Sequence, residues 1–177
     1  MYQTKSEHTA LALSVIVALA KKQDIESLKN NKIPVDLEKK LACFVSIHLT
    51  DGNLRGCIGT IEPREENLYL EIISNAVSAS TRDTRFTPLR EDELENISVS
   101  VDVLGIPYLI NSISELDPSK LGVIVSDGAF MRAVLLPNIE GINTVEKQLA
   151  IAKRKAGLQN YDNNKLKIMA FTSTRYH

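Results

Sequence analysis

The residues with the clearest capacity for chemistry lie in the segment LRGCIG, residues 54–59. Arg55 and Cys57 are two positions apart, so on a β-strand their side chains project from the same face. A cation beside a thiol favours the thiolate, the nucleophilic form of cysteine, and lowers its pKa. Gly56 and Gly59 lack Cβ atoms and let a ligand or another backbone approach closely. We therefore predict the working site at this segment.

A β-hairpin is expected to position the segment. Residues 43–49 have the β-branched and aromatic content of a strand, residues 54–61 read as its partner, and Asp51-Gly52 is a strong hairpin turn signal. A two-residue turn predicts these facing pairs: Leu49 with Leu54, His48 with Arg55, Ile47 with Gly56, Ser46 with Cys57, and Val45 with Ile58.

This register separates two faces. The apolar face holds Cys43, Val45, Ile47, Leu49, Leu54 and Ile58, and the polar face holds Ser46, His48, Arg55 and Cys57. His48 would lie diagonal to Cys57 and could serve as base or acid. Because Cys43 points to the opposite face, no disulfide joins the two cysteines. The competing interpretation is that Cys57 is a packing residue on a half-exposed hairpin.

A second polar cluster follows the helix expected over residues 67–80. Arg82 and Arg85 could clamp a carboxylate or phosphate, and together with Arg55 they would form an anion site beside the hairpin. Alternatively, Asp83 pairs with an arginine and pins the loop. Arg132, on an apolar hairpin, is expected to form a buried structural ion pair.

Composition narrows the function classes. The chain has 177 residues and a net charge of −1, which fits one domain and argues against extended nucleic acid or an anionic membrane as partners. The apolar run at residues 10–20 is too short to span a membrane. A buried helix over residues 6–22, opened by a capping box of Thr4 and Glu7, is favoured over a signal peptide. Free thiols fit a reducing, cytoplasmic location.

The remaining pattern predicts an α+β fold without a βαβ rhythm. A half-buried strand is expected at residues 97–104, an apolar and central hairpin at 121–136, a helix at 144–156 ending at Gly157, and a last strand at 166–172. Residues 1–177 would form a single domain of antiparallel sheets flanked by helices. Two sub-lobes, seeded by the two hairpins, would leave a cleft near LRGCIG. No metal-ligand spacing or glycine-rich phosphate loop is present, so we expect no cofactor.

Several motifs together resemble the AMMECR family. CFVSIHLTDG followed by LRGCIGTIEP looks like its signature, and ISVSVDVL and RAVLLPNIEGINTVEKQLAIAKRKAGL are similar to its later segments. RDTRFTPL resembles its arginine-rich loop, with Thr84 where the family usually has proline. The resemblance implies an α+β fold with two lobes and a cleft near LRGCIG. It points to Arg55, Gly56, Cys57, Gly59, Arg82, Asp83 and Arg85 as site residues.

The resemblance also implies partners. Microbial members of this type occur beside a Memo-like protein and a radical S-adenosylmethionine enzyme, as protein A of the AmmeMemoRadiSam system. Three hypotheses remain open. The favoured one is an accessory protein of that system, which binds a partner or a small anionic ligand at the LRGCIG cleft. The second is a thiol-dependent transferase or ligase that uses Cys57, with His48 as base. The third is a nucleotide or nucleic-acid binding module, which rests on the arginines alone.

Overall fold

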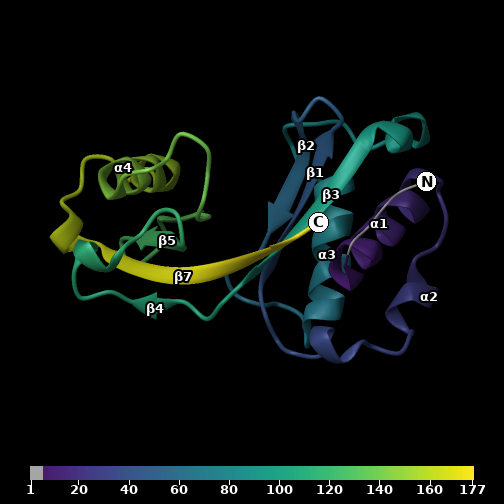
Figure 1. Cartoon of the computed structure of the whole chain (residues 1–177), viewed down its shortest axis with the longest axis horizontal. Helices are drawn as coiled ribbons and strands as arrows, with labels where there is room; N and C mark the ends of the chain where they lie inside the picture. Colours follow the sequence, from purple (N-terminus) through teal and green to yellow (C-terminus); the bar gives the residue numbers. More distant parts are fainter. Residues whose placement is uncertain (1–5) are drawn as a thin grey trace. The chain divides into compact units, whose positions relative to one another are not determined.

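The protein is described by a computed structural model over residues 6–177, and it forms two compact units. The first unit comprises Met1–Val103 with Arg175–His177, and the second comprises Leu104–Thr174. Helices and antiparallel strands occur in both units, which confirms the predicted α+β class (Figure 1). A single domain over residues 1–177, and a cleft at the hairpin, stay predictions.

Helices of the first unit cover one face of a three-stranded antiparallel sheet with strand order β2-β1-β3. Its elements are α1 (Glu7–Ala20), α2 (Glu26–Lys29), β1 (Cys43–Leu49), β2 (Leu54–Gly59), α3 (Leu68–Thr81) and β3 (Ile97–Leu104). Short 3₁₀ turns, η1 (Val35–Leu37) and η2 (Glu91–Asn96), lie between them. The strand β2 is therefore an edge strand, whose outer backbone groups need partners from elsewhere.

The core of this unit lies between the sheet and the helices α1 and α3, which pack against each other (Figure 1). Val45 and Ile47 of β1 are fully buried there, as is Ile72 of α3. The helix α1 begins after Ser6, whose hydroxyl accepts a hydrogen bond from the backbone N–H of Thr9 at 3.2 Å. The predicted capping box needs Thr4, which lies outside the described residues.

The hairpin register is confirmed in its inner half and wrong near the turn. Val45 faces Ile58, Ser46 faces Cys57 and Ile47 faces Gly56, as predicted. The register then shifts between Ile47 and His48, and His48 faces Leu54 instead of Arg55. Arg55 is the extra residue of a β-bulge, which bends a strand and redirects a side chain.

The turn itself explains the shift. The backbone N–H of Leu49 donates to the carbonyl of Asn53 at 2.8 Å, so Leu49 does not pair with Leu54. The predicted two-residue turn is thus a longer loop, and Gly52 within it has a positive φ of 87°. The Asp-Gly dipeptide located the turn correctly, but the loop is one residue longer than the predicted two-residue turn.

The second unit has a sheet of strand order β4-β7-β5-β6 and one α-helix within its described residues. The elements are β4 (Tyr108–Leu109), β5 (Leu121–Ser126), β6 (Arg132–Leu135), α4 (Val145–Ala156) and β7 (Lys167–Tyr176), with 3₁₀ turns η3 (Ile113–Glu115) and η4 (Asn163–Lys165). As predicted, Gly157 ends α4 in the left-handed conformation.

Two expectations about this unit are corrected. The hairpin of β5 and β6 was expected to be central. Of its two strands, β5 has a neighbouring strand on each side, but β6 lies at the edge of the sheet. Arg132, the first residue of β6, is exposed, so it is no interior charge. The neighbouring strand β5 is buried along most of its length, so its buried and exposed residues do not alternate.

Across residues 6–177, no helix has both the length and the apolar character that crossing a membrane requires.

Candidate functional site

The candidate site lies on the face of the β2-β1-β3 sheet opposite the helices. Side chains alternate along each strand, so the residues between the core positions point to this second face. We call it the polar face and define it by Ser46, His48, Cys57, Ser98, Ser100 and Asp102. Ser46 is the centre, because it faces Cys57 on one neighbouring strand and Ser100 on the other.

Cys57 is held firmly at its backbone. Its N–H donates to the Asp83 carboxylate at 2.9 Å, and its carbonyl accepts from the Arg85 guanidinium at 3.2 Å. Both groups lie on the outer edge of β2, so the loop after α3 supplies the partners that an edge strand lacks. The loop residues predicted as ligand-binding, Asp83 and Arg85, therefore act on this strand.

The thiol of Cys57 is in a different electrostatic state from the one predicted. Ser46 donates its hydroxyl hydrogen to the sulfur at 3.2 Å, which confirms that the two side chains share a face. Burial raises the pKa of the Cys57 thiol, while the Ser46 hydrogen bond and the Arg85 charge oppose this rise without reversing it. A raised pKa leaves the thiol protonated at neutral pH, whereas a lowered one was expected.

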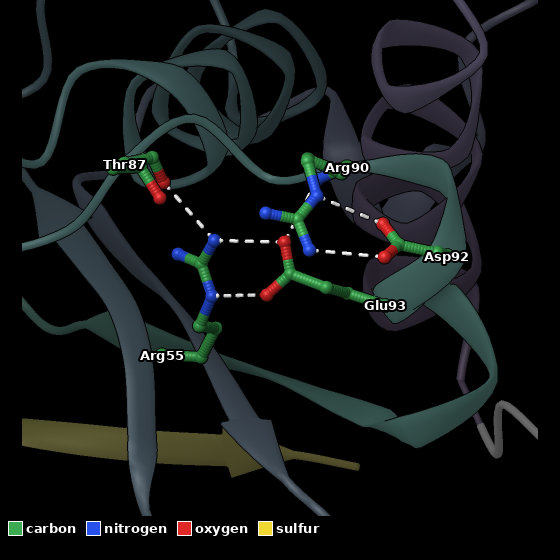
Figure 2. A network of polar contacts seen from close by, with 5 residues as sticks. All are labelled: Arg55, Thr87, Arg90, Asp92 and Glu93. Carbon is green, nitrogen blue, oxygen red and sulfur yellow. Dashed lines mark hydrogen bonds and ion pairs between the residues drawn. The ribbon is translucent and has the colours of Figure 1, made fainter.

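Arg55 does not activate Cys57, because its charge is already neutralised. The guanidinium donates to both carboxylate oxygens of Glu93, at 2.6 and 3.0 Å, and to the carbonyl of Thr87 at 3.0 Å (Figure 2). Arg55 also lies over the ring of Phe86, 5.7 Å from its centroid. The bulge directs this side chain towards η2, where it forms an ion pair whose side chains are 10% and 21% exposed.

Asp83 is the most strongly perturbed carboxylate of the site. Arg85 binds it through two nitrogens at 2.7 and 2.9 Å, and this pairing lowers the pKa of the Asp83 carboxyl to about 2. The N–H groups of Cys57 and Arg85 contribute in the same direction. The pair pins the loop against β2, which was the alternative interpretation of this cluster.

The three arginines have different contacts, and an anion site that they share stays a prediction. Arg85 reaches the hairpin, as predicted, and its guanidinium lies 5.4 Å from the centroid of Phe86. Arg55 approaches the same ring but is bound to Glu93. Arg82 is exposed and lines a separate pocket on α3.

His48 occupies the polar face but makes no hydrogen bond to Cys57 among residues 6–177. Burial lowers the pKa of His48, and the charge of Arg175 lowers it further. The imidazole is therefore neutral at neutral pH and could accept a proton. The structure keeps it on the predicted face, beside Ser98 and away from Arg55.

The two glycines of the motif permit close backbone packing. A Cβ atom on Gly56 would overlap the carbonyl oxygen of Ala79 in α3, and one on Gly59 would overlap the Phe44 ring. Their predicted role was to admit a ligand. In this structure the space is taken by the chain itself, and a ligand role for Gly56 and Gly59 stays a prediction.

Three polar residues were missed by sequence reasoning. Asp102 is buried on the polar face and forms a two-point ion pair with Arg175 at 2.9 and 3.1 Å. Ser100 is 4% exposed, and its hydroxyl has no hydrogen-bond partner within the described residues 6–177. Glu71 is 1% exposed in α3 and accepts from the N–H groups of Arg64 and Glu65, each at 2.8 Å.

A signal for these residues was present in the strand and helix patterns. The strand ISVSVDVL alternates apolar with polar residues, so its polar side chains had to lie on one face of the sheet, beside polar residues of a neighbouring strand. Glu71 falls beside the apolar stripe of its helix, where a carboxylate needs hydrogen-bond donors.

Residues 6–177 contain no group of three or more His, Cys, Asp or Glu side chains placed to hold a metal ion.

The chain is thus an α+β protein in which the edge strand LRGCIG is clamped by an arginine–aspartate loop. Comparison with known proteins identifies the family. The AMMECR1 family model matches residues 9–176, and the chain belongs to this family.

Relatives and a solved structure agree with this assignment. A protein of Thermotoga maritima is 51% identical over 148 residues, covering 83% of this chain and 84% of its own. A protein of Clostridium acetobutylicum is 49% identical over 123 residues, or 70% of this chain, but the match covers only 26% of that longer protein. The crystal structure of an uncharacterized protein from Pyrococcus horikoshii matches with a TM-score of 0.85 and 28% identity, over 98% of this chain and 92% of that one.

Proposed function

We propose that this AMMECR1-family protein is an accessory component of a radical-enzyme modification system, in which it binds a partner or substrate. By the resemblance of its motifs, the other components are a Memo-like protein and a radical S-adenosylmethionine enzyme. The polar face around Cys57 is the proposed contact surface. There the chain would hold a partner segment or a small anionic substrate for chemistry performed elsewhere.

The observation that best supports a binding role is the state of Cys57. Both of its backbone groups are fixed by Asp83 and Arg85, yet the pKa of its thiol is raised. A nucleophilic cysteine is normally set in surroundings that lower its pKa. Rigid presentation of a protonated thiol suits recognition, because a preformed surface loses little conformational entropy on binding.

The remaining groups of the polar face fit the same role. Ser98 is exposed, and His48 and Cys57 are half-buried, so these three side chains are open to a bound group. The charge of Arg175 is paired with the buried Asp102, but the Arg175 side chain is 45% exposed and could still donate to an anionic group.

A second candidate, a thiol-dependent transferase or ligase, keeps one observation in its favour. The Ser46 hydroxyl and the Arg85 charge both lower the pKa of Cys57 against the effect of burial. Such an enzyme would have to deprotonate Cys57 when substrate arrives, with the neutral His48 as the base. The two candidates predict different effects on product formation when the Cys57 thiol is replaced.

Binding assays with the purified proteins test the proposal. The Memo-like protein and the radical enzyme from the same source are titrated separately with the full chain by calorimetry. Ser98→Lys, which puts a long cation on the exposed edge of the polar face, should weaken the complex at least tenfold. Ser14→Lys, on an exposed position of α1, should leave it unchanged.

The Cys57→Ser variant separates the candidates. An accessory role predicts that Cys57→Ser still binds and still supports the radical enzyme. A thiol-dependent enzyme predicts normal binding with complete loss of product. Failure of the unmodified chain to bind either protein overturns the accessory proposal.

A further inference from the structure

A pocket of about 410 Å³ lies on the outer side of α3, close to α2. Its volume falls within the range of small-molecule sites, which is about 300–1,000 Å³. All of its lining residues belong to the first unit, and Cys57 is not one of them. It is therefore separate from the polar face.

The floor of the pocket is apolar. Leu70, Ile73 and Val77 lie at positions i, i+3 and i+7 of α3, so they form one stripe along the helix. Ile25, just before α2, closes the stripe from the other side. Leu70 and Val77 are only half-buried, so an apolar ligand would cover surface that water now contacts.

The rim of the pocket carries more positive than negative charge. Its charged lining residues are Lys29, Arg82 and Glu65. The ammonium of Lys29 is bound to Glu26 at 2.7 Å, an exposed pair. Arg82 forms no ion pair with any residue from 6 to 177, so its guanidinium remains available to an incoming anion.

Arg82 differs in this respect from its neighbours in the loop. Arg85 is bound to Asp83, and Arg90 is bound to Asp92 through two nitrogens at 2.9 and 3.0 Å. The loop thus uses two of its three arginines internally and turns the third towards an apolar pocket. A cation above an apolar floor is the arrangement that binds an anion with an apolar body.

We propose that this pocket binds a small amphipathic anion, an aryl or branched aliphatic carboxylate or sulfonate. Its apolar body would lie on Leu70, Ile73 and Val77, and its anionic group would contact Arg82 and Lys29. This site is additional to the proposed partner surface and does not depend on it. Arg82 was first predicted as a ligand residue of the LRGCIG site, and here it is proposed for the pocket that it lines.

Arg82 is also the residue that follows the last turn of α3, where a cation is favourable near the negative end of the helix dipole. A loss of stability in an Arg82 variant would therefore not identify a ligand site. The test has to measure binding itself.

The anionic dye 8-anilinonaphthalene-1-sulfonate serves as probe, with the folded full-length chain. Its fluorescence should rise saturably with one site per chain, and phenylacetate or the branched 4-methylpentanoate should displace it. Arg82→Gln should weaken binding about tenfold, because one charge-assisted contact is lost. Ser74→Phe, which fills the pocket from an exposed position, should abolish binding.

Arg90→Gln is the matched control, since it removes an exposed arginine of the same loop that does not line the pocket. It should bind the dye as the unmodified chain does. Equal affinities for Arg82→Gln and Arg90→Gln would overturn the proposal. So would the absence of saturable binding by all three probes. Neither result bears on the partner assays with Ser98→Lys.

Discussion

The two faces of the β2-β1-β3 sheet use the same strands for opposite purposes. On the helix-covered face, Val45 and Ile47 are fully buried among apolar neighbours. On the polar face, Ser46 and Ser100 are almost as buried, yet the Ser100 hydroxyl has no hydrogen-bond partner among residues 6–177. A buried polar group without a partner is costly in a core, so the two faces differ in how completely their polar groups are hydrogen-bonded.

The two cysteines show the same difference in chemical terms. Cys43 lies on the helix-covered face, where burial raises the pKa of its thiol to about 12. Cys57 lies on the polar face, where the Ser46 hydroxyl and the Arg85 charge partly oppose the effect of burial. Both sulfurs accept a hydrogen bond, from Asn75 and Ser46 respectively, but Cys43 is fully buried and Cys57 is partly exposed.

The largest expected effect comes from the helix-covered face. Ile47→Ala should destabilise the protein by about 2–5 kcal/mol, because it removes apolar contacts from a fully buried position and leaves a cavity. Urea unfolding monitored by circular dichroism measures this change. A cost below about 1 kcal/mol would mean that this face is not the principal core of the unit.

Arg55→Ala tests the ion pair at the edge of the site. Glu93 would be left largely buried without its counter-charge, and a loss of about 3 kcal/mol is expected. The control is Arg90→Ala, which breaks the exposed Arg90–Asp92 pair (Figure 2), and it should cost much less than Arg55→Ala. Equal losses of unfolding free energy in the two variants would show that Arg55 is not a structural residue and would favour a ligand-binding role for it.

Acid unfolding sharpens the role of Asp83. The pKa of its carboxyl is about 2 in the folded protein, below the ordinary value of 3.8. Because the folded pKa is the lower one, the stabilisation is present above about pH 4 and is lost as the pH falls towards 2. Allowing for the exposed Arg85, the contribution is about 1–2 kcal/mol.

Asp83→Asn should remove this component of the pH dependence. Its free energy of unfolding should fall less steeply between pH 4 and pH 2 than that of the unmodified chain. Asp162→Asn, at an exposed site of the second unit, should keep the original slope. Parallel curves for Asp83→Asn and the unmodified chain would contradict the clamp.

Ser100→Ala should have the smallest effect and the opposite sign. Its hydroxyl is buried without a partner, so removing it should leave stability unchanged or raise it by up to about 1 kcal/mol. Thermal unfolding measures the change. A loss above 1 kcal/mol would reveal a hydrogen bond that this account lacks, and the polar face would then be a satisfied part of the core.

Sequence reasoning located the elements and the pairing at the centre of the polar face. Alternation along β1 and β2, with the Asp-Gly turn between them, was enough to place Ser46 opposite Cys57 and to separate Cys43 from it, because side-chain direction follows directly from strand geometry. Gly157 as a helix end and the α+β class followed from local signals of similar strength. These features depend on a few neighbouring residues.

The errors concern partners that are distant along the chain. Arg55 was assigned to Cys57 because the two are close in sequence, but Glu93 lies 38 residues away and captures it. The bulge that redirects Arg55 arises from a longer turn, which an Asp-Gly pair does not specify. The burial that raises the pKa of Cys57 is likewise a tertiary property, and adjacent residue types could not reveal it.

The reactivity of Cys57 tests the central claim most directly. Iodoacetamide labelling of the folded chain over a pH series, read by mass spectrometry, gives the apparent pKa of this thiol. The account predicts a pKa for Cys57 above that of an unstructured cysteine. In Arg55→Lys the pKa should still be raised, and in Ser46→Ala it should rise further because the hydrogen bond to sulfur is removed. Cys43 should remain unlabelled until the protein unfolds. An apparent pKa for Cys57 below that of the unstructured cysteine would contradict the account and favour nucleophilic catalysis at LRGCIG.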